Sequence, residues 1–212
     1  IMAFTRRIVE ADKFTREGKF KGWAPELLCG NDVYRKTIGI IGAGRIGQAT
    51  GRRAAGFDMD ILYYNRTKKD KFEFETDAEK VELEYLLENS DIISLHVPLT
   101  EDTKHLIDEK ELNKMKDSAY LINTARGPVI NEYALVKTLK NKNIAGAALD
   151  VFEEEPDVHP GLINLPNVVL TPHIGSATVR TRNKMAEMAA DSIIKVLSDE
   201  RPKDVVNPEV YK

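Results

Sequence analysis

A glycine-rich loop between a short apolar run and a helix-length segment constrains the fold of this chain more than any other feature. The loop, Gly42-Ala43-Gly44-Arg45-Ile46-Gly47, matches G-x-G-x-x-G and directly follows the apolar run 37–41. In that position Gly42 permits a tight turn, Gly44 lets the backbone approach a pyrophosphate, and Gly47 lets helix and strand pack closely. The N–H groups at the start of the following helix add a binding site for phosphates. We therefore predict that these six residues bind a dinucleotide; an ordinary glycine-rich turn is the alternative.

Five further apolar runs follow this first one along the chain. Each is short and does not alternate with polar residues, which is typical of strands buried on both faces of a parallel sheet. Segments with helix-start signals separate the runs, so the order strand, helix, strand repeats. We predict an α/β fold with a doubly wound, Rossmann-like parallel sheet. The runs lie at 61–64, 92–95, 119–122, 145–151 and 168–170.

Helices are predicted between the strands and at both ends of the chain. Asp108 and Glu111 form a capping-box pattern, and Asn131 is an N-cap for a helix that ends near Leu139. Helical spacing of apolar residues predicts further helices over 81–87, from Ile1 to about Phe14, and from about Thr178 to Leu197. The predicted organisation is an interdomain or dimerisation helix with an arm at 1–35, a dinucleotide-binding domain at 36–177, and a C-terminal helix and tail at 178–212.

The composition excludes several classes of function. The 212 residues carry a net charge of −3, and no basic stripe marks a nucleic-acid interface. No apolar run approaches the ~20 residues of a membrane-spanning helix. Cys29 is the single cysteine and the four histidines lack metal-ligand spacing, so we expect neither a disulfide framework nor a metal site. Because no signal-peptide pattern is present, we expect a cytoplasmic protein without nucleic-acid or membrane partners.

The residues after the second predicted strand indicate which dinucleotide binds. An NAD site usually has an acidic residue about 20 positions after the first glycine, where it bonds the ribose 2′-hydroxyl. Here Asn65 lies 23 positions after Gly42, Arg66 and Thr67 follow, and the segment 64–69 contains no carboxylate. Arg66, helped by Asn65 and Thr67, can bond a 2′-phosphate with charge assistance. The turn therefore favours NADP(H), while NAD(H) stays possible and a solvated basic turn is the alternative interpretation.

Three segments that follow predicted strands carry side chains suited to catalysis. Arg126 follows the fourth strand, at the edge where open parallel sheets bind ligands, and can hold a carboxylate in a bidentate pair. The segment 150–156 follows the fifth strand and contains three consecutive glutamates, and His173 follows the sixth strand. On the residues alone each has a structural alternative: an arginine that caps loop carbonyls, a solvated acidic loop, and a structural histidine. His96, at the end of the third strand, is expected to line the cofactor cleft.

Together these motifs resemble one family, the D-isomer-specific 2-hydroxyacid dehydrogenases. The resemblance covers nearly the whole chain and rests on several motifs in order. Among family members, the turn Asn65-Arg66-Thr67 and the loop 152–156 are most similar to those of glyoxylate/hydroxypyruvate reductases. Besides the glycine loop, the motifs are His96-Val97-Pro98-Leu99-Thr100, Asn123-Thr124-Ala125-Arg126-Gly127, the segment 146–156 and Thr171-Pro172-His173-Ile174-Gly175-Ser176.

The resemblance implies a role for each residue of a catalytic set. Arg126 resembles the arginine that holds the 2-oxoacid carboxylate and polarises the ketone. His173 resembles the general acid that protonates the carbonyl oxygen as hydride arrives from the nicotinamide. Glu155, which lies 29 residues after Arg126 and directly before Pro156, resembles the acid that bonds this histidine. A carboxylate beside a histidine favours the imidazolium form, which suits an acid in the reductive direction.

The resemblance also implies contacts between the chain and its cofactor. Asp150 resembles the residue that orients the nicotinamide carboxamide. The other residues implied to line the cofactor, with Arg126 and His173, are Val97, Pro98, Thr124, Ala125, Ile174 and Gly175.

Family members carry a second domain, built mostly from residues that would precede the first helix of this chain. The resemblance therefore implies a truncated form, which we do not expect to turn over substrate alone. With that domain, it implies NAD(P)H-dependent reduction of glyoxylate or hydroxypyruvate, and D-lactate-type, phosphoglycerate and phosphite dehydrogenation are the related possibilities. A dinucleotide-sensing corepressor of the same fold, which acts through partner proteins, is the alternative from another class.

Apolar residues near the start of the chain predict an assembly. Phe4, Ile8 and Phe14 lie on one predicted helix, and the arm over 20–28 carries more apolar surface than a solvated loop needs. The resemblance implies that these elements pair two copies about a symmetry axis, so we predict a homodimer held by residues 1–28. An arm that folds back on its own sheet is the alternative.

Overall fold

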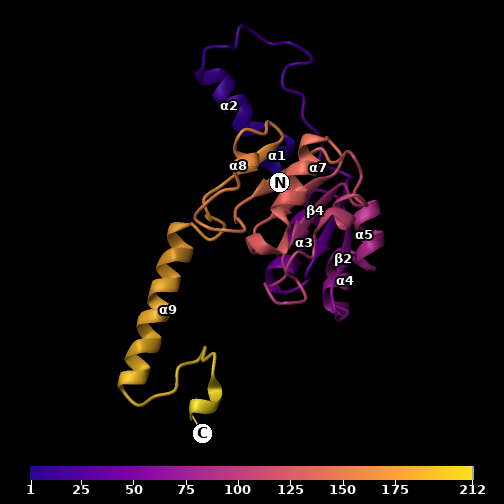
Figure 1. The fold of residues 1–212 in the computed structure, drawn as a ribbon. Helices are drawn as coiled ribbons and strands as arrows, with labels where there is room; N and C mark the ends of the chain where they lie inside the picture. The colour runs from indigo at the N-terminus through magenta and orange to yellow at the C-terminus, as the bar shows by residue number, and fades with distance from the viewer. Residues whose placement is uncertain (212) are drawn as a thin grey trace. The chain divides into compact units, whose positions relative to one another are not determined.

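The computed structural model describes residues 1–211, which form two compact units, Ile1–Pro172 and the residues from His173 onward. The first unit is built around a sheet with helices packed beside it (Figure 1). The sheet has seven parallel strands in the order β3-β2-β1-β4-β5-β6-β7. This order reverses direction between β1 and β4, so the predicted doubly wound α/β sheet is confirmed. The strands are β1 Thr37–Ile41, β2 Asp60–Tyr64, β3 Glu79–Lys80, β4 Ile92–Leu95, β5 Tyr120–Asn123, β6 Gly146–Leu149 and β7 Val168–Leu170.

Two apolar cores lie on the two faces of this sheet. Successive residues of a strand point to opposite faces, and the cores follow that alternation: Ile40 belongs to one core and Ile41 to the other. In the register of the sheet, Ile38 lies between Ile61 of β2 and Ile92 of β4, and all three are buried. Because both faces are covered, the strands are apolar throughout their length rather than at alternate positions.

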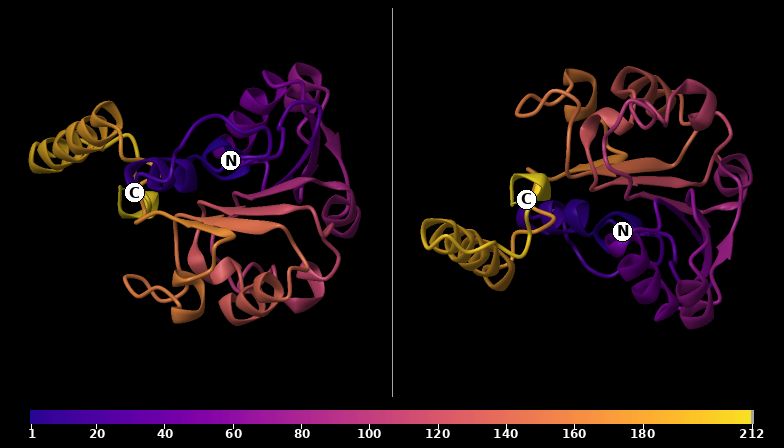
Figure 2. Two further views of the ribbon diagram at one scale, coloured as in Figure 1. Left: turned by 90° about the horizontal axis from the view of Figure 1, so that it is seen from above. Right: turned by 90° about the horizontal axis from the view of Figure 1, so that it is seen from below.

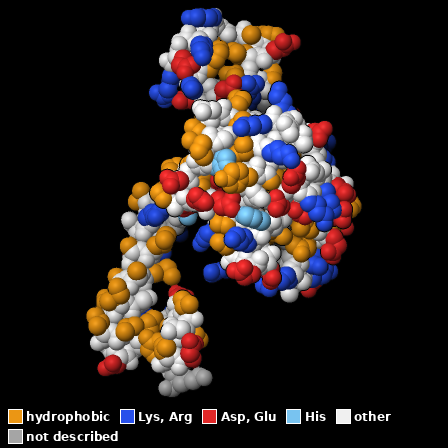
Figure 3. Space-filling view, viewed as in Figure 1, with side chains coloured by type: hydrophobic (Ala, Val, Ile, Leu, Met, Phe, Trp, Pro, Cys, Tyr) orange, Lys and Arg blue, Asp and Glu red, His pale blue; other side chains and the backbone are white. Residues whose placement is uncertain are grey.

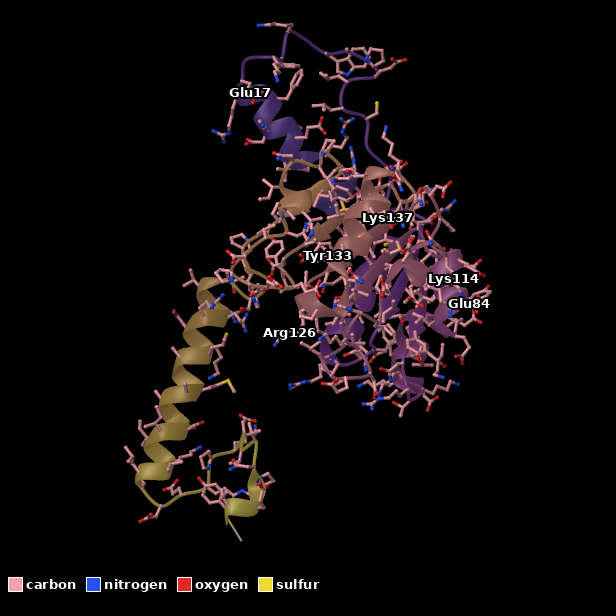
Figure 4. All side chains as sticks on the ribbon, in the orientation of Figure 1. Glu17, Glu84, Lys114, Arg126, Tyr133 and Lys137 are labelled. Carbon is pink, nitrogen blue, oxygen red and sulfur yellow. The ribbon has the colours of Figure 1, made fainter. Side chains whose placement is uncertain are left out.

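Helices cover both faces of the sheet (Figure 2). On one face, α3 Arg45–Ala55 and α4 Asp70–Thr76 contribute Ala54 and Phe72 to the core. On the other face, the helices that contribute to the second core are α5 Leu83–Asn89, α6 Glu109–Leu112, α7 Glu132–Lys140 and α8 Pro160–Ile163. An ion pair between Glu84 and Lys114 joins α5 to the segment that follows α6 (Figure 4).

Three helix starts that the sequence predicts are confirmed by their caps. Asp108 and Glu111 form the capping box of α6. At α7, the side chain of Asn131 accepts the backbone N–H of Ala134 at 3.2 Å. At α9, Val179–Leu197, Thr178 caps the first turn in the same way. These side-chain oxygens satisfy backbone donors that the geometry of a helix leaves without partners.

The prediction of one helix from Ile1 to about Phe14 is wrong, because the segment forms two helices, α1 Met2–Thr5 and α2 Ile8–Arg16. Arg7 separates them with a φ of 52°, in the left-handed region. The backbone oxygen of Thr5 accepts the N–H of Asn31 from the arm at 2.8 Å. A contact with a distant residue thus interrupts the helix. Three further elements, β3, α4 and α8, were not predicted from the sequence.

Apolar side chains are exposed in the N-terminal arm and on α9. In the arm, Phe20 is 55% exposed and Trp23 is 86% exposed. None of the described residues of α9 is buried, and apolar side chains lie open along this helix (Figure 3). A short 3-10 helix, η2 Pro208–Tyr211, follows in the same unit. Within residues 1–211, no helix is long and apolar enough to cross a membrane.

Candidate active site

The glycine loop lies where the strand order reverses, at the carboxyl ends of β1 and β4. Gly42 has a φ of 99°, and a Cβ there would lie 2.8 Å from the backbone nitrogen of Val97. A Cβ on Gly47 would lie 2.2 Å from the carbonyl oxygen of Gly42. The first position requires glycine because of its conformation, and the second because helix and loop are in backbone contact. Both requirements agree with the roles that the sequence assigned to these glycines.

The N-terminus of α3 is open for a phosphate group. Gly44 is the N-cap, and a Cβ added to it would meet no atom within 4 Å. No side chain caps this helix start, while Gln48 holds the loop by donating to the carbonyl of Ala43 at 2.9 Å. Arg45 and Ile46 are exposed in the first turn. The N–H groups of that turn and the positive end of the helix dipole suit a pyrophosphate.

A pocket of about 280 Å³ joins the glycine loop to the turn after β2. Arg66 lines it, is exposed, and makes no hydrogen bond or ion pair within residues 1–211. Its neighbour Lys68, by contrast, pairs with Asp70 at 3.4 Å and with Glu73 at 3.1 Å. Asp102 is the carboxylate among the lining residues. The guanidinium of Arg66 is therefore available to an anionic group of a ligand in this pocket.

The turn that carries Arg66 is fixed by hydrogen bonds from the buried side of the strand. The hydroxyl of Tyr63 donates to Glu73 at 2.7 Å and accepts the N–H of Lys69 at 2.8 Å. Burial, together with the bond to Glu73, raises the pKa of Tyr63 to about 12. Asn65 donates to the carbonyl of Thr67 at 2.8 Å. Asn65 therefore shapes the turn, in addition to the ligand contact that the sequence suggests for it.

His96 lies at the end of β4 and lines the same pocket. Its Nε2 is 3.0 Å from the hydroxyl of Ser94, which is buried in the strand. Burial lowers the pKa of His96 to about 4, because a charged imidazolium would lose its hydration there. The ring is therefore neutral at neutral pH, and this part of the pocket wall carries no charge.

The loop after β4 forms one wall of the pocket, and only some of its lining residues were predicted from the sequence. Val97 and Pro98, which were predicted to line the cofactor, do line the pocket. The hydroxyl of Thr103 closes the loop by donating to the carbonyl of Pro98 at 2.6 Å. The sequence contains a signal for this turn, because Thr100 and Thr103 are three residues apart. At that spacing the hydroxyl of Thr103 accepts the backbone N–H of Thr100. The lining residues of this loop that were missed are Thr100, Asp102, Thr103 and Leu106, and Tyr64 of β2 was missed as well.

Arg126 lies on a turn that is shaped by the buried Asn123 at the end of β5. The side chain of Asn123 donates to the carbonyl of Arg126 at 2.9 Å and accepts the N–H of Ala125 at 3.0 Å. A Cβ on Gly127 would lie 1.8 Å from the carbonyl oxygen of Phe152, so the turn is in backbone contact with the loop after β6. Arg126 itself is exposed and extends from the edge of the first unit (Figure 4). Thr124 is also exposed on this turn.

The loop after β6 carries the two carboxylates that the sequence singled out. Asp150 is 5% exposed and accepts the hydroxyl of Thr171 at 2.6 Å. Glu155 is exposed, and its Oε1 accepts the N–H of Phe152 at 3.1 Å. The carboxyl edge of the sheet therefore brings together the loops with Asp150, Glu155 and Arg126.

His173, Ile174 and Gly175 belong to the second unit. His173 is exposed and has a φ of 52°. The placement of His173 against Arg126 and Glu155 stays a prediction. Throughout the described part of the chain, no group of three or more His, Cys, Asp or Glu residues is arranged to hold a metal ion.

Known proteins are similar to this chain in sequence and in architecture. The family model described as "D-isomer specific 2-hydroxyacid dehydrogenase, NAD binding domain" matches residues 1–175. A glyoxylate reductase of Korarchaeum cryptofilum is 53% identical over 215 residues, which cover 100% of this chain and 64% of that protein. A glyoxylate reductase of Thermofilum pendens is 55% identical over 218 residues, which cover 100% and 63%. The crystal structure of the TT0316 protein from Thermus thermophilus superposes with a TM-score of 0.90 at 43% identity, covering 97% of this chain and 64% of that one.

The chain thus spans somewhat less than two thirds of the length of the curated relatives that it matches. The family match includes the glycine loop and the loops after β4, β5 and β6, and it indicates a nicotinamide dinucleotide as the cofactor. The sequence, the reversal in strand order and the structural match agree, and the chain belongs to the D-isomer specific 2-hydroxyacid dehydrogenase family, whose NAD-binding domain it contains.

Proposed function

We propose that the full-length protein reduces a small 2-oxoacid, glyoxylate or hydroxypyruvate, with NADPH. One observation carries this proposal: the glycine loop, the Arg126 turn and the Glu155 loop lie at one edge of the sheet. That edge is where open α/β sheets bind their ligands. A bound nicotinamide dinucleotide supplies the hydride. The relatives named glyoxylate reductases support the choice of substrate.

The side chains of the chain itself bind the substrate and move the proton. Arg126 holds the carboxylate of the 2-oxoacid through charge-assisted hydrogen bonds and polarises the ketone. His173 donates a proton to the carbonyl oxygen, and Glu155 bonds the histidine and favours its protonated form. Asp150, held by Thr171, orients the carboxamide of the nicotinamide. The remaining residues proposed to line the cofactor are Val97, Pro98, Thr124, Ala125, Ile174 and Gly175.

The preference for NADPH is proposed from the pocket after β2. Arg66 faces it without an acidic partner, whereas the charge of Lys68 is compensated by Asp70 and Glu73. A 2′-phosphate adds a dianionic group that a guanidinium binds in a bidentate manner, and no carboxylate in the turn repels it.

Calorimetric titration of the full-length protein with NADPH and with NADH tests this preference. Arg66→Ala should weaken NADPH binding by about 10- to 100-fold, the usual value of a hydrogen bond to a charged group, and leave NADH binding unchanged. Arg53→Ala is a matched control, because this arginine bonds the carbonyl of Ala49 on α3 and does not line the pocket. A preference for NADH that Arg66→Ala does not change would contradict the proposal.

We extend the proposal to assembly and location. The exposed Trp23 and Phe20 support a homodimer held by residues 1–28, since patches of this kind usually contact a partner. A cytoplasmic location belongs to the same proposal and rests on the sequence alone.

A further inference from the structure

Glu153 occupies the centre of a hydrogen-bonded cluster behind the proposed catalytic loops. Its Oε1 lies 2.5 Å from Nε2 of His105, and its Oε2 accepts the backbone N–H of Glu132 at 3.1 Å. The bond to Glu132 is reciprocal, because the backbone N–H of Glu153 donates to Oε1 of Glu132 at 2.9 Å. Glu132 is only 4% exposed. Burial raises the pKa of Glu132, while the N–H of Glu153 opposes that rise.

The cluster joins three segments that each reach a different part of the site. His105 belongs to the loop after β4, which lines the pocket through Thr103 and Leu106. Glu132 is the first residue of α7 and lies six residues after Arg126. Glu153 lies two residues before Glu155. A single carboxylate therefore connects the proposed cofactor pocket to the two loops with proposed catalytic side chains.

Backbone contacts around the cluster hold the same segments in register. The N–H of His105 donates to the carbonyl of Pro128 at 2.8 Å. Gly127 packs directly on the backbone of Phe152 and Glu153. With the backbones already in contact, a change in the side-chain bonds of Glu153 shifts both loops together.

The three consecutive glutamates differ sharply in their surroundings. Both oxygens of Glu153 accept hydrogen bonds, from an imidazole and from a backbone amide. Glutamine offers one acceptor and one donor, so it would leave one of these donors without a partner. Glu154 is exposed, and its side chain makes no hydrogen bond within the described residues 1–211. Neighbouring positions of the same residue type thus provide a variant and its matched control.

We propose that Glu153, bound to His105 and Glu132, is a positioning residue that fixes the Arg126 turn and the Glu155 loop against the cofactor pocket. This inference rests on the proposed function of Arg126 and Glu155. Glu153 acts through these neighbours and does not contact the reacting atoms. A misplacement of a catalytic group by about 1 Å can lower the rate by about 100-fold. Loss of the bonds of Glu153 should therefore lower turnover more than it lowers the affinity for the cofactor.

The test compares Glu153→Gln with Glu154→Gln in the full-length enzyme. Glu153→Gln should lower kcat for glyoxylate by about 10- to 100-fold, with little change in the Kd for NADPH. Glu154→Gln should match the wild type in both quantities. His105→Gln, which keeps a donor near the position of Nε2, should retain more activity than His105→Leu. An unchanged kcat in Glu153→Gln, or equal activities of the two His105 variants, would overturn the positioning role.

Amide hydrogen exchange separates this inference from the proposed function. The amide protons of Glu132 and Glu153 should be protected in the wild type and exchange faster in Glu153→Gln. Unchanged protection in the variant would overturn the inference, whatever the activity. If the full-length wild type reduces no 2-oxoacid, the proposed function fails, and the positioning role that rests on it fails as well. The exchange data would then still decide whether the cluster holds the two loops together.

Discussion

Replacing His96 by glutamine should make the free energy of unfolding less dependent on pH, because the partly buried His96 ring has a lowered pKa in the folded state. Burial lowers the pKa of His96 to about 4, whereas a histidine in the unfolded chain titrates near its ordinary value of 6.5. Between these two values the unfolded chain binds a proton that the folded chain does not. The free energy of unfolding therefore falls as the pH falls through this window. Above pH 6.5 the ring is neutral in both states, and the contribution of His96 to stability is complete.

The size of the effect follows from the difference between the two pKa values. The interval from about 4 to 6.5 corresponds to about 3 kcal/mol, at about 1.36 kcal/mol for each pKa unit. This value is an upper limit, because His96 lines an open pocket where solvent screens its charge. Glutamine does not titrate and keeps a polar group near the hydroxyl of Ser94. The variant should therefore lose less stability than the wild type on acidification to about pH 4, by up to about 3 kcal/mol.

Urea unfolding followed by far-ultraviolet circular dichroism, at a series of pH values from neutral to acidic, measures this difference. The carboxylates titrate alike in both proteins and cancel in the comparison. The reasoning would be refuted if the wild type and His96→Gln lost stability in parallel. An NMR titration of the His96 ring with a midpoint near its ordinary value would refute it as well.

Three further predictions concern the loops, the catalytic set and the assembly. Gly127→Ala should lower the free energy of unfolding by about 1–3 kcal/mol or more, because the added Cβ overlaps the backbone of Phe152. Gly44→Ala is the control, because a Cβ there meets no atom within 4 Å, and it should lower the free energy of unfolding much less in the same urea experiment. In the full-length enzyme, His173→Ala should lower kcat by about 10²–10⁴-fold, and near-normal turnover would contradict its role as the proton donor. Light scattering of the chain should give twice the monomer mass of 23.9 kDa, and the monomer mass would instead show that the arm packs within one chain.

The main strands were predictable because each leaves a local trace, an apolar run beside a turn signal. β3 leaves no such trace, since Glu79 and Lys80 are charged residues that pair with β2 at the edge of the sheet. In α4, Phe72 is the buried residue, and its ring packs where Gly51 of α3 has no side chain. Because α4 buries this one side chain against a glycine of another helix, its own sequence shows no apolar periodicity.

The site shows the same limit at Glu153, Glu154 and Glu155. The resemblance to a family singled out Glu155, but the residues themselves do not distinguish the three positions. In the structure Glu153 differs because Glu132 and His105, which lie 21 and 48 residues before it, supply hydrogen bonds. Arg66 could be proposed from the sequence because its context is local, a basic turn directly after a buried strand. Partners distant in the sequence leave no comparable pattern.

The strand order places the two ends of the proposed dinucleotide site far apart on one edge. The Arg66 turn follows β2 and the Arg126 turn follows β5, and β1 and β4 lie between these strands. Three steps of about 4.8 Å between neighbouring strands separate the turns by about 14 Å. If the Arg66 turn binds the 2′-phosphate as proposed, substitutions within 65–69 should change the coenzyme preference while the loops after β5 and β6 keep their geometry. On the proposed function, a change of coenzyme and a change of substrate would therefore require substitutions in different loops of the sheet.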